Sequence, residues 1–97
     1  MNAKEILLKA RKLIELPENW TRNRSARNKD GIGVEHDHPD ACKFCMLGAI
    51  WSVAGYNSDA EEILRKQTPV GSISTFNDDS AHEMVLKAFD DAIASCE

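Results

Sequence analysis

The chain has 97 residues, of which 42% are hydrophobic and 29% are charged, and its formal net charge is −4. This length leaves room for one hydrophobic core but not for two, and the acidic balance argues against a protein that binds nucleic acid over its whole surface. We therefore expect a single, mainly α domain over residues 1–97. It would be a compact bundle of about four helices, with one long loop or small hairpin between helices 1 and 2.

The first predicted helix runs from Asn2 to Leu16. Asn2 and Glu5 have the spacing of a capping box, in which each side chain accepts a hydrogen bond from the backbone N–H of the other residue. Pro17 is expected to end the helix, because it has no N–H to donate. Apolar residues recur at steps of three and four, as on the buried face of a helix, at Ala3, Ile6, Leu7, Ala10, Leu13 and Ile14.

Residues 17–40 lack this periodicity and are rich in Asn, Asp, Gly and Arg. Asp30-Gly31 is typical of a tight turn, so we predict a long loop that contains a small hairpin over residues 24–35. Trp20 is expected to anchor the loop to the core. The loop also carries a basic patch, which a phosphate or a nucleic acid could bind, formed by Arg22, Arg24, Arg27 and Lys29.

Residues 41–54 are apolar almost all round, which predicts a central helix that other elements cover on most sides. Gly48 within this helix costs about 1 kcal/mol relative to Ala, and we expect another helix to cross closely there. Gly48→Leu should then overpack the centre, whereas Gly48→Ala should be mild. Gly55 is predicted to end the helix as a left-handed cap.

Two further helices are predicted, each opened by a capping box. Ser58 and Glu61 open a short helix that ends near Lys66, and Ser80 and Glu83 open the last one. The last helix has an apolar stripe at Val85, Ala88, Phe89, Ala92, Ile93 and Cys96.

The segment at residues 36–45 contains the side chains that zinc accepts, at His36, His38, Cys42 and Cys45. Cys42-x-x-Cys45 is the spacing that many structural zinc sites use for one pair of thiolates. The two histidines precede this pair so closely that the four ligands would form a cramped ring, and both cysteines also fit a buried helix as small hydrophobic residues. We expect no metal and no other cofactor, and keep a zinc-stabilised module as an alternative.

Cys45, His82 and Asp78 can be combined as a nucleophile, a base and an orienting group. Cys45, however, is expected in the middle of a helix, away from the helix start that lowers a thiol pKa, and Cys45→Ser should be destabilising there. Asn77 and Asp78 are explained as partners of turn and helix N–H groups, with Asp78 and Asp79 at the positive end of the last helix. We therefore predict no enzymatic activity.

Two short motifs resemble those of DUF6197, a bacterial and phage family of unknown function. The family has Trp-Cys-x-x-Gly-Ala in a core helix and Trp-Asn-Asp before a helix that ends in Ala-Ile. This chain has Phe44-Cys45-x-x-Gly48-Ala49 and Phe76-Asn77-Asp78 in those places, with Phe where the family has Trp. The resemblance spans residues 13–94 and implies a fold but no activity. It requires a Cys at position 45 and none at position 42, which argues further against zinc.

The three cysteines cannot all pair within one chain, no leader peptide precedes the first helix, and residues 41–54 are too short to span a membrane. We therefore expect a cytoplasmic protein without membrane contact. Residues 1–56 hold nine Lys and Arg against seven Asp and Glu, a balance of +2, whereas residues 57–97 hold three against nine, a balance of −6. Such asymmetry occurs at partner surfaces and at solvated faces alike.

From these features we predict a small binding or regulatory module of phage-related type, which contacts a partner protein through its acidic C-terminal half. A nucleic-acid partner is the weaker expectation. The candidate surface residues are Arg22, Arg24, Arg27, Lys29, Asn77, Asp78 and Asp79.

Overall fold

The computed structural model describes residues 1–69 and 71–96. Within these residues the chain is mainly helical, with five α-helices, one short 3-10 helix and a small three-stranded sheet. In chain order the elements are α1 (Ala3–Leu13), η1 (Pro17–Asn19), β1 (Ala26–Arg27), β2 (Gly33–Val34), β3 (Lys43–Phe44), α2 (Met46–Ala54), α3 (Asp59–Arg65), α4 (Ile73–Asp79) and α5 (His82–Ala94).

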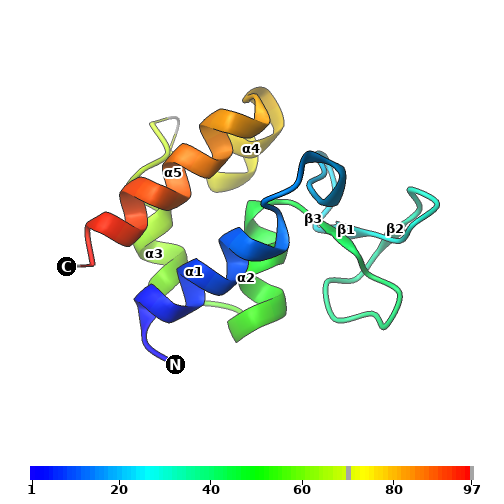
Figure 1. Ribbon diagram of the computed structural model, residues 1–97, viewed down its shortest axis with the longest axis horizontal. Helices are drawn as coiled ribbons and strands as arrows, with labels where there is room; N and C mark the ends of the chain where they lie inside the picture. Colours follow the sequence, from blue (N-terminus) through cyan, green and yellow to red (C-terminus); the bar gives the residue numbers. More distant parts are fainter. Residues whose placement is uncertain (70, 97) are drawn as a thin grey trace.

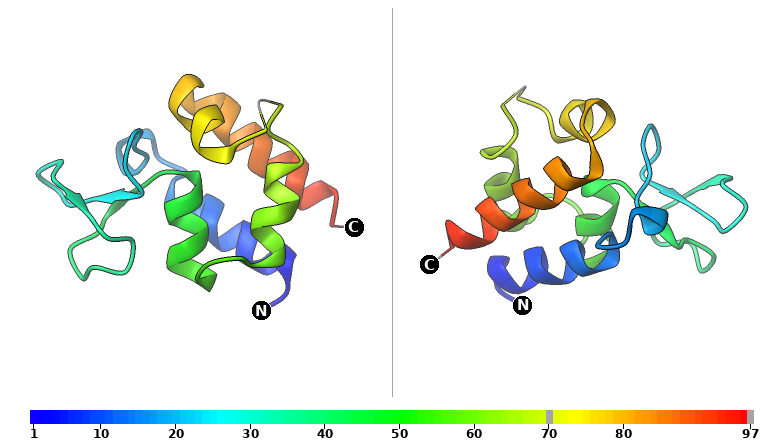
Figure 2. Two further views of the ribbon diagram at one scale, coloured as in Figure 1. Left: turned by 180° about the vertical axis from the view of Figure 1, so that it is seen from behind. Right: turned by 45° about the horizontal axis from the view of Figure 1, so that its top comes forward.

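The molecule has two parts, a helical body and an arm. The helical body consists of α1 to α5, and the arm is the segment of residues 20–45 that carries the sheet (Figure 1). Both views in Figure 2 show the arm extending away from the helices, with the N-terminus and the end of α5 on the opposite side of the body. No helix among the described residues is long and apolar enough to cross a membrane.

Helix α1 packs against α2, α3 and α5. The predicted capping box is confirmed, because Asn2 Oδ1 accepts from the Glu5 N–H at 2.9 Å and Glu5 Oε1 accepts from the Asn2 N–H at 3.3 Å. The helix ends at Leu13, earlier than predicted, and Ile14 caps it. The largest fully buried apolar side chains of the body are Leu7, Ile14, Met46, Ile50, Leu64, Val85 and Phe89.

The hairpin predicted in the loop is confirmed. β1 and β2 pair antiparallel, with Ala26 opposite Val34, and the turn between them contains Gly31 at a φ of +81°. Asn28 closes this turn, because its Oδ1 accepts from the Asp30 N–H at 2.9 Å and the Ile32 N–H at 3.1 Å. β3 adds to the other edge of β1, so that the strand order is β2-β1-β3.

The predicted start of the central helix is wrong by five residues, since α2 begins at Met46 and not at residue 41. The preceding backbone is extended and bonded to the arm: the Cys42 N–H donates to Arg27 O at 3.0 Å, and the Cys45 N–H donates to Ser25 O at 3.2 Å. A short apolar run does not distinguish a buried strand from a helix by its periodicity alone. Cys45 thereby becomes the N-cap of α2.

Gly48 does pack closely against another segment, but that segment is not the helix that we predicted. A Cβ atom at Gly48 would lie 1.8 Å from the carbonyl oxygen of Ser25, in the arm. Gly55 ends α2 as predicted, and its N–H donates to Trp51 O at 2.8 Å. Its φ of +75° favours glycine, but its ψ of −168° lies outside the left-handed helical region that we predicted for this cap.

The region after α3 differs most from prediction. Ser58 caps α3 as expected, but the predicted capping box at Ser80 is wrong, because Ser80 ends the unpredicted helix α4 and Ala81 is the N-cap of α5. Asp78 and Asp79 therefore lie at the C-terminal, negative end of α4 and not at the positive end of α5. The predicted apolar stripe of α5 is confirmed, since its residues are buried or packed against the core.

Candidate functional site

Asn77 is a completely buried side chain that joins the arm to the helical body. Its Oδ1 accepts from Trp20 Nε1 at 2.7 Å and from the Met46 N–H at 3.1 Å, and its Nδ2 donates to Thr21 O at 3.1 Å. Met46 is the first residue of α2, whose N–H has no partner within the helix. The predicted role of Asn77 as a partner of helix N–H groups is confirmed, and its placement in a partner surface is wrong because the side chain is buried.

Asp78 is half-buried beside this junction. Its Oδ1 accepts from the Asn23 N–H at 2.9 Å and from Asn77 Nδ2 at 3.1 Å. Asn23 has a φ of +69°, a conformation that Asn adopts more readily than most residues. Within the described residues Asp78 Oδ2 makes no hydrogen bond, and it is open to solvent.

A cavity of about 230 Å³ opens where the arm meets α2 and α4. We call it the junction cavity. Four residues of the arm, two of α2 and two of α4 line it, and the fourth arm residue is the N-cap of α2. They are Asn23, Arg24, Ser25, Cys45, Leu47, Trp51, Ser74 and Asp78. It therefore combines an apolar wall with hydroxyl, amide, thiol and charged groups.

Trp51 also belongs to an aromatic cluster next to the junction cavity. Its ring contacts Tyr56 with a centroid distance of 4.9 Å and His36 with a centroid distance of 5.7 Å, and His36 contacts Tyr56 at 5.2 Å. Trp51 Nε1 donates to Glu61 Oε1 at 2.9 Å, which holds the indole in place. Tyr56 is 62% exposed, so the aromatic cluster of His36, Trp51 and Tyr56 reaches the surface.

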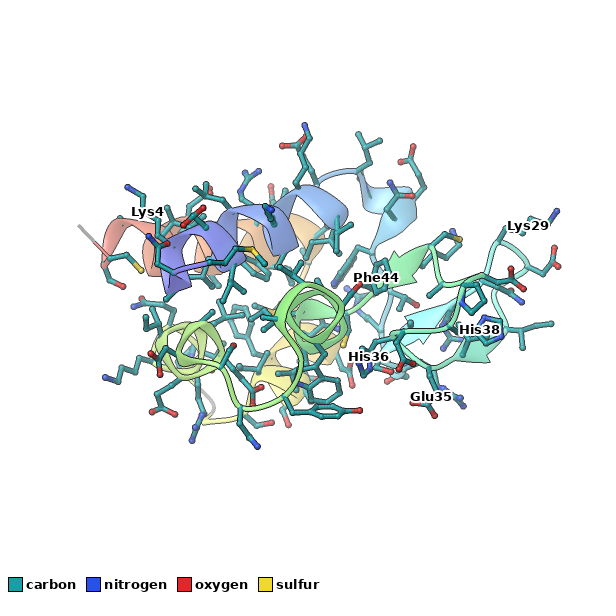
Figure 3. The ribbon with its side chains drawn as sticks, turned by 90° about the horizontal axis from the view of Figure 1, so that it is seen from below. Lys4, Lys29, Glu35, His36, His38 and Phe44 are labelled. Atoms are coloured by element: carbon teal, nitrogen blue, oxygen red, sulfur yellow. The ribbon has the colours of Figure 1, made fainter. Side chains whose placement is uncertain are left out.

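The structure does not bring together the four residues of the zinc alternative. His36 packs in the aromatic cluster near α2, whereas His38 lies farther out on the arm (Figure 3). The exposed His38 ring accepts from the Asp40 N–H at 3.0 Å, Cys42 is exposed, and Cys45 is buried. Among the described residues no three His, Cys, Asp or Glu side chains are placed to share a metal ion.

Cys45 lies at a helix start, contrary to our expectation that it would be in the middle of a helix. Its Sγ accepts from the Gly48 N–H at 3.3 Å. Burial raises the pKa of the Cys45 thiol, and the carboxylate of Asp78 raises this pKa further, so that the protonated thiol is favoured. His82 does not line the junction cavity; its Nε2 lies 2.7 Å from Ile14 O, and its ring packs on Trp20. Cys45, Asp78 and His82 thus form no catalytic arrangement in this structure.

The predicted basic patch divides into structural and exposed residues. Arg27 donates to Thr21 Oγ1, Gly31 O and Arg22 O, so it braces the hairpin from within. Arg22 lies over the Trp20 ring, 4.6 Å from its centroid, and donates to Ser80 O. Arg24 and Lys29 are exposed, and within the described residues neither forms a hydrogen bond or an ion pair.

The sequence marks three of the cavity residues as candidates, namely Arg24, Cys45 and Asp78. Leu47 and Trp51 fit core positions of the predicted central helix, and nothing in the local pattern around Ser25 or Ser74 marks a site. An exposed aromatic residue directly after the central helix, Tyr56, is the one signal that could have indicated a surface site there.

The two motifs that resemble DUF6197 meet at this junction. Cys45 and Gly48 contact the Ser25 backbone, while Asn77 and Asp78 bind backbone groups of α2 and the arm. No curated protein and no solved structure matches the chain. Residues 1–95 match the model of the family described as "Family of unknown function (DUF6197)", and the chain belongs to this family.

Proposed function

We propose that this domain is a protein-binding module whose contact surface is the junction cavity together with the aromatic cluster. The observation that carries the proposal is the position of Trp51, which forms a wall of the cavity and also belongs to the aromatic cluster. Trp and Tyr are enriched among the residues that dominate protein–protein binding energy, especially next to pockets that exclude water.

The size of the junction cavity supports a macromolecular partner. Pockets for drug-sized ligands measure about 300–1,000 Å³, whereas this cavity has about 230 Å³. It is suited to one side chain of a larger partner, with the aromatic cluster in contact with the adjacent chain.

The charges of the C-terminal half also favour the junction cavity and the aromatic cluster as the binding surface, in place of the whole acidic surface of that half. Asp90 pairs with Arg11 at 2.6 Å, Asp91 pairs with Lys87 at 2.8 Å, and Glu62 pairs with Arg65. These three acidic side chains are therefore paired on the helical surface, whereas Asp78 comes from the same half of the chain and faces the cavity. The acidic half would then act mainly through Asp78.

The proposal is tested by selecting binders from a phage-displayed random peptide library on the immobilised domain and measuring the affinity of the best peptide. Tyr56→Ala should weaken binding at least about tenfold, as expected for an exposed aromatic side chain that contributes strongly to the contact. Met84→Ala is the matched control, since Met84 on α5 is also exposed, at 47%, but lies outside this surface. Failure to enrich any peptide, or equal losses in the two variants, would contradict the proposal.

A further inference from the structure

We infer that the junction cavity receives one Lys or Arg side chain of the partner protein, with its charged head at Asp78 and its aliphatic stem against Leu47 and Trp51. This inference rests on the proposed function and specifies the chemistry of the partner at that surface.

The first argument is that Asp78 is held in position and has a free acceptor. The Asn23 N–H and Asn77 Nδ2 both bind Oδ1, so that little side-chain freedom remains to be lost when a ligand binds. Asp78 Oδ2 is solvent-accessible and makes no hydrogen bond within the described residues. A carboxylate oxygen of this kind accepts well from an ammonium or guanidinium group.

The second argument concerns the sign of the charge in the cavity. Arg24 contributes to the lining, but its guanidinium lies over Gly33 of β2, where a Cβ atom would meet Arg24 Cζ at 2.3 Å. Within the described residues Arg24 forms no ion pair with Asp78. Asp78 is the acidic side chain in the lining, and its carboxylate is not neutralised there.

The third argument is the apolar wall. Leu47 and Trp51 are half-buried members of α2 that face the cavity. Lys and Arg carry long apolar stems that pack on such surfaces, and a guanidinium or ammonium group over an indole gains a further cation–π attraction. An acidic side chain has a shorter apolar stem, gains no cation–π attraction and would be repelled by Asp78.

The experiment uses the peptides selected on the parent domain. We expect a Lys or Arg at one fixed position in the enriched sequences. Asp78→Asn should weaken binding of the best peptide about tenfold or more, because it removes the charge while an amide oxygen still accepts from the Asn23 N–H. Asp79→Asn is the matched control, since this neighbour is exposed and lies outside the cavity, and it should change the affinity less than about twofold.

A double-mutant cycle makes the assignment specific. Replacing the basic residue of the peptide by norleucine should weaken binding to the parent domain but have little further effect on Asp78→Asn. Independent effects in this cycle, or enriched peptides without a basic residue, would overturn the inference and leave the proposed function intact. Absence of any enriched peptide would overturn both. Should Asp78→Asn not fold, the norleucine substitution on the parent domain still decides whether the basic residue is required.

Discussion

The helical body and the arm are stabilised by different kinds of interaction. The body is held by close-packed apolar side chains such as Leu7, Ile50 and Phe89, each completely buried. In the arm Ala26 is completely buried and Phe44 is nearly so. The arm is held mainly by hydrogen bonds, which are made by Arg27, Asn28 and the buried Asn77 of α4. Apolar contacts depend mainly on volume, whereas each polar tie needs one particular partner.

This difference predicts at which positions a substitution destabilises the molecule most. Full burial of a large apolar side chain contributes about 1.5–3 kcal/mol, and neighbours can adjust to small changes in shape. A buried hydrogen-bonding group that loses its partner lowers the free energy of unfolding by about 1–3 kcal/mol, because small shifts of its neighbours do not replace the lost hydrogen bond. The following variants probe the contacts between the two parts and the contacts within the arm.

The largest effect is expected at Gly48, where α2 touches the arm. Gly48→Ala should lower the free energy of unfolding by about 3 kcal/mol or more, and Gly48→Leu by more still, because the backbone of Ser25 blocks the space for a Cβ. A helix crossing at Gly48 would have made Gly48→Ala mild, so the contact with the Ser25 backbone changes that prediction. Urea denaturation followed by circular dichroism measures the change, with the exposed Ser52→Ala on the same helix as control. A Gly48→Ala protein as stable as the parent would disprove the contact.

Removing the side chain of Asn77 should have the next largest effect. Asn77→Ala leaves Trp20 Nε1, the Met46 N–H and the Thr21 carbonyl without their partner, and should cost about 2–3 kcal/mol. Chemical denaturation tests this, with Asp79→Ala as the exposed control. If the two variants are equally stable, Asn77 does not tie the arm to the body.

Within the arm, Arg27→Met should cost about 1–2 kcal/mol, since three hydrogen bonds are lost while the apolar stem is kept. Hydrogen exchange should show faster exchange at the Cys42 and Asn28 amides, with the amides of α1 and α5 unchanged. Lys29→Met, an exposed change on the same hairpin, should leave the exchange as in the parent. Equal acceleration throughout the helices would mean that arm and body unfold together.

The histidines of the zinc alternative should behave differently from each other. His36→Ala should cost about 1 kcal/mol, because the ring packs against Trp51 and Tyr56, whereas the exposed His38→Ala should have little effect. A chelator should leave the melting midpoint unchanged. Equal losses for both histidines together with a lower midpoint after chelation would instead support a structural zinc site.

The smallest effect concerns Cys45 and pH. Its folded-state pKa is raised above the ordinary value of 9.0, mainly by burial. The unfolded thiol therefore loses its proton first, so the stability due to Cys45 is complete below pH 9.0 and is lost as pH rises through the folded pKa.

Cys45→Ser should remove this alkaline loss and differ from the parent by less than about 1 kcal/mol at pH 7, since Ser is a good N-cap. In the middle of a helix, Cys45→Ser would destabilise the protein more than this. Melting curves of both proteins between pH 7 and 10.5 make the comparison, and parallel alkaline losses would contradict the assignment.

The sequence by itself determined the elements whose signals are local. The Asn2–Glu5 capping box and the three- and four-residue periodicity predict α1 and α5, and Asp30-Gly31 predicts the hairpin, because all these signals involve residues within about four positions of each other. The two short motifs were also sufficient to indicate the family whose model matches residues 1–95.

Only the tertiary structure decided where α2 begins, that α4 exists and where a site lies. The Met46 N–H and Asn77 are 31 positions apart in sequence, and Gly48 is shaped by the distant Ser25 backbone. Such contacts override the local preference of an apolar run for a helix, since the arm's backbone offers the partners that make residues 42–45 extended. Folding also buries Asn77 and places Arg27 in hydrogen bonds that hold the hairpin, whereas Asp78 stays at the junction cavity. The exposure of these polar side chains depends on which surfaces pack together and not on residue type.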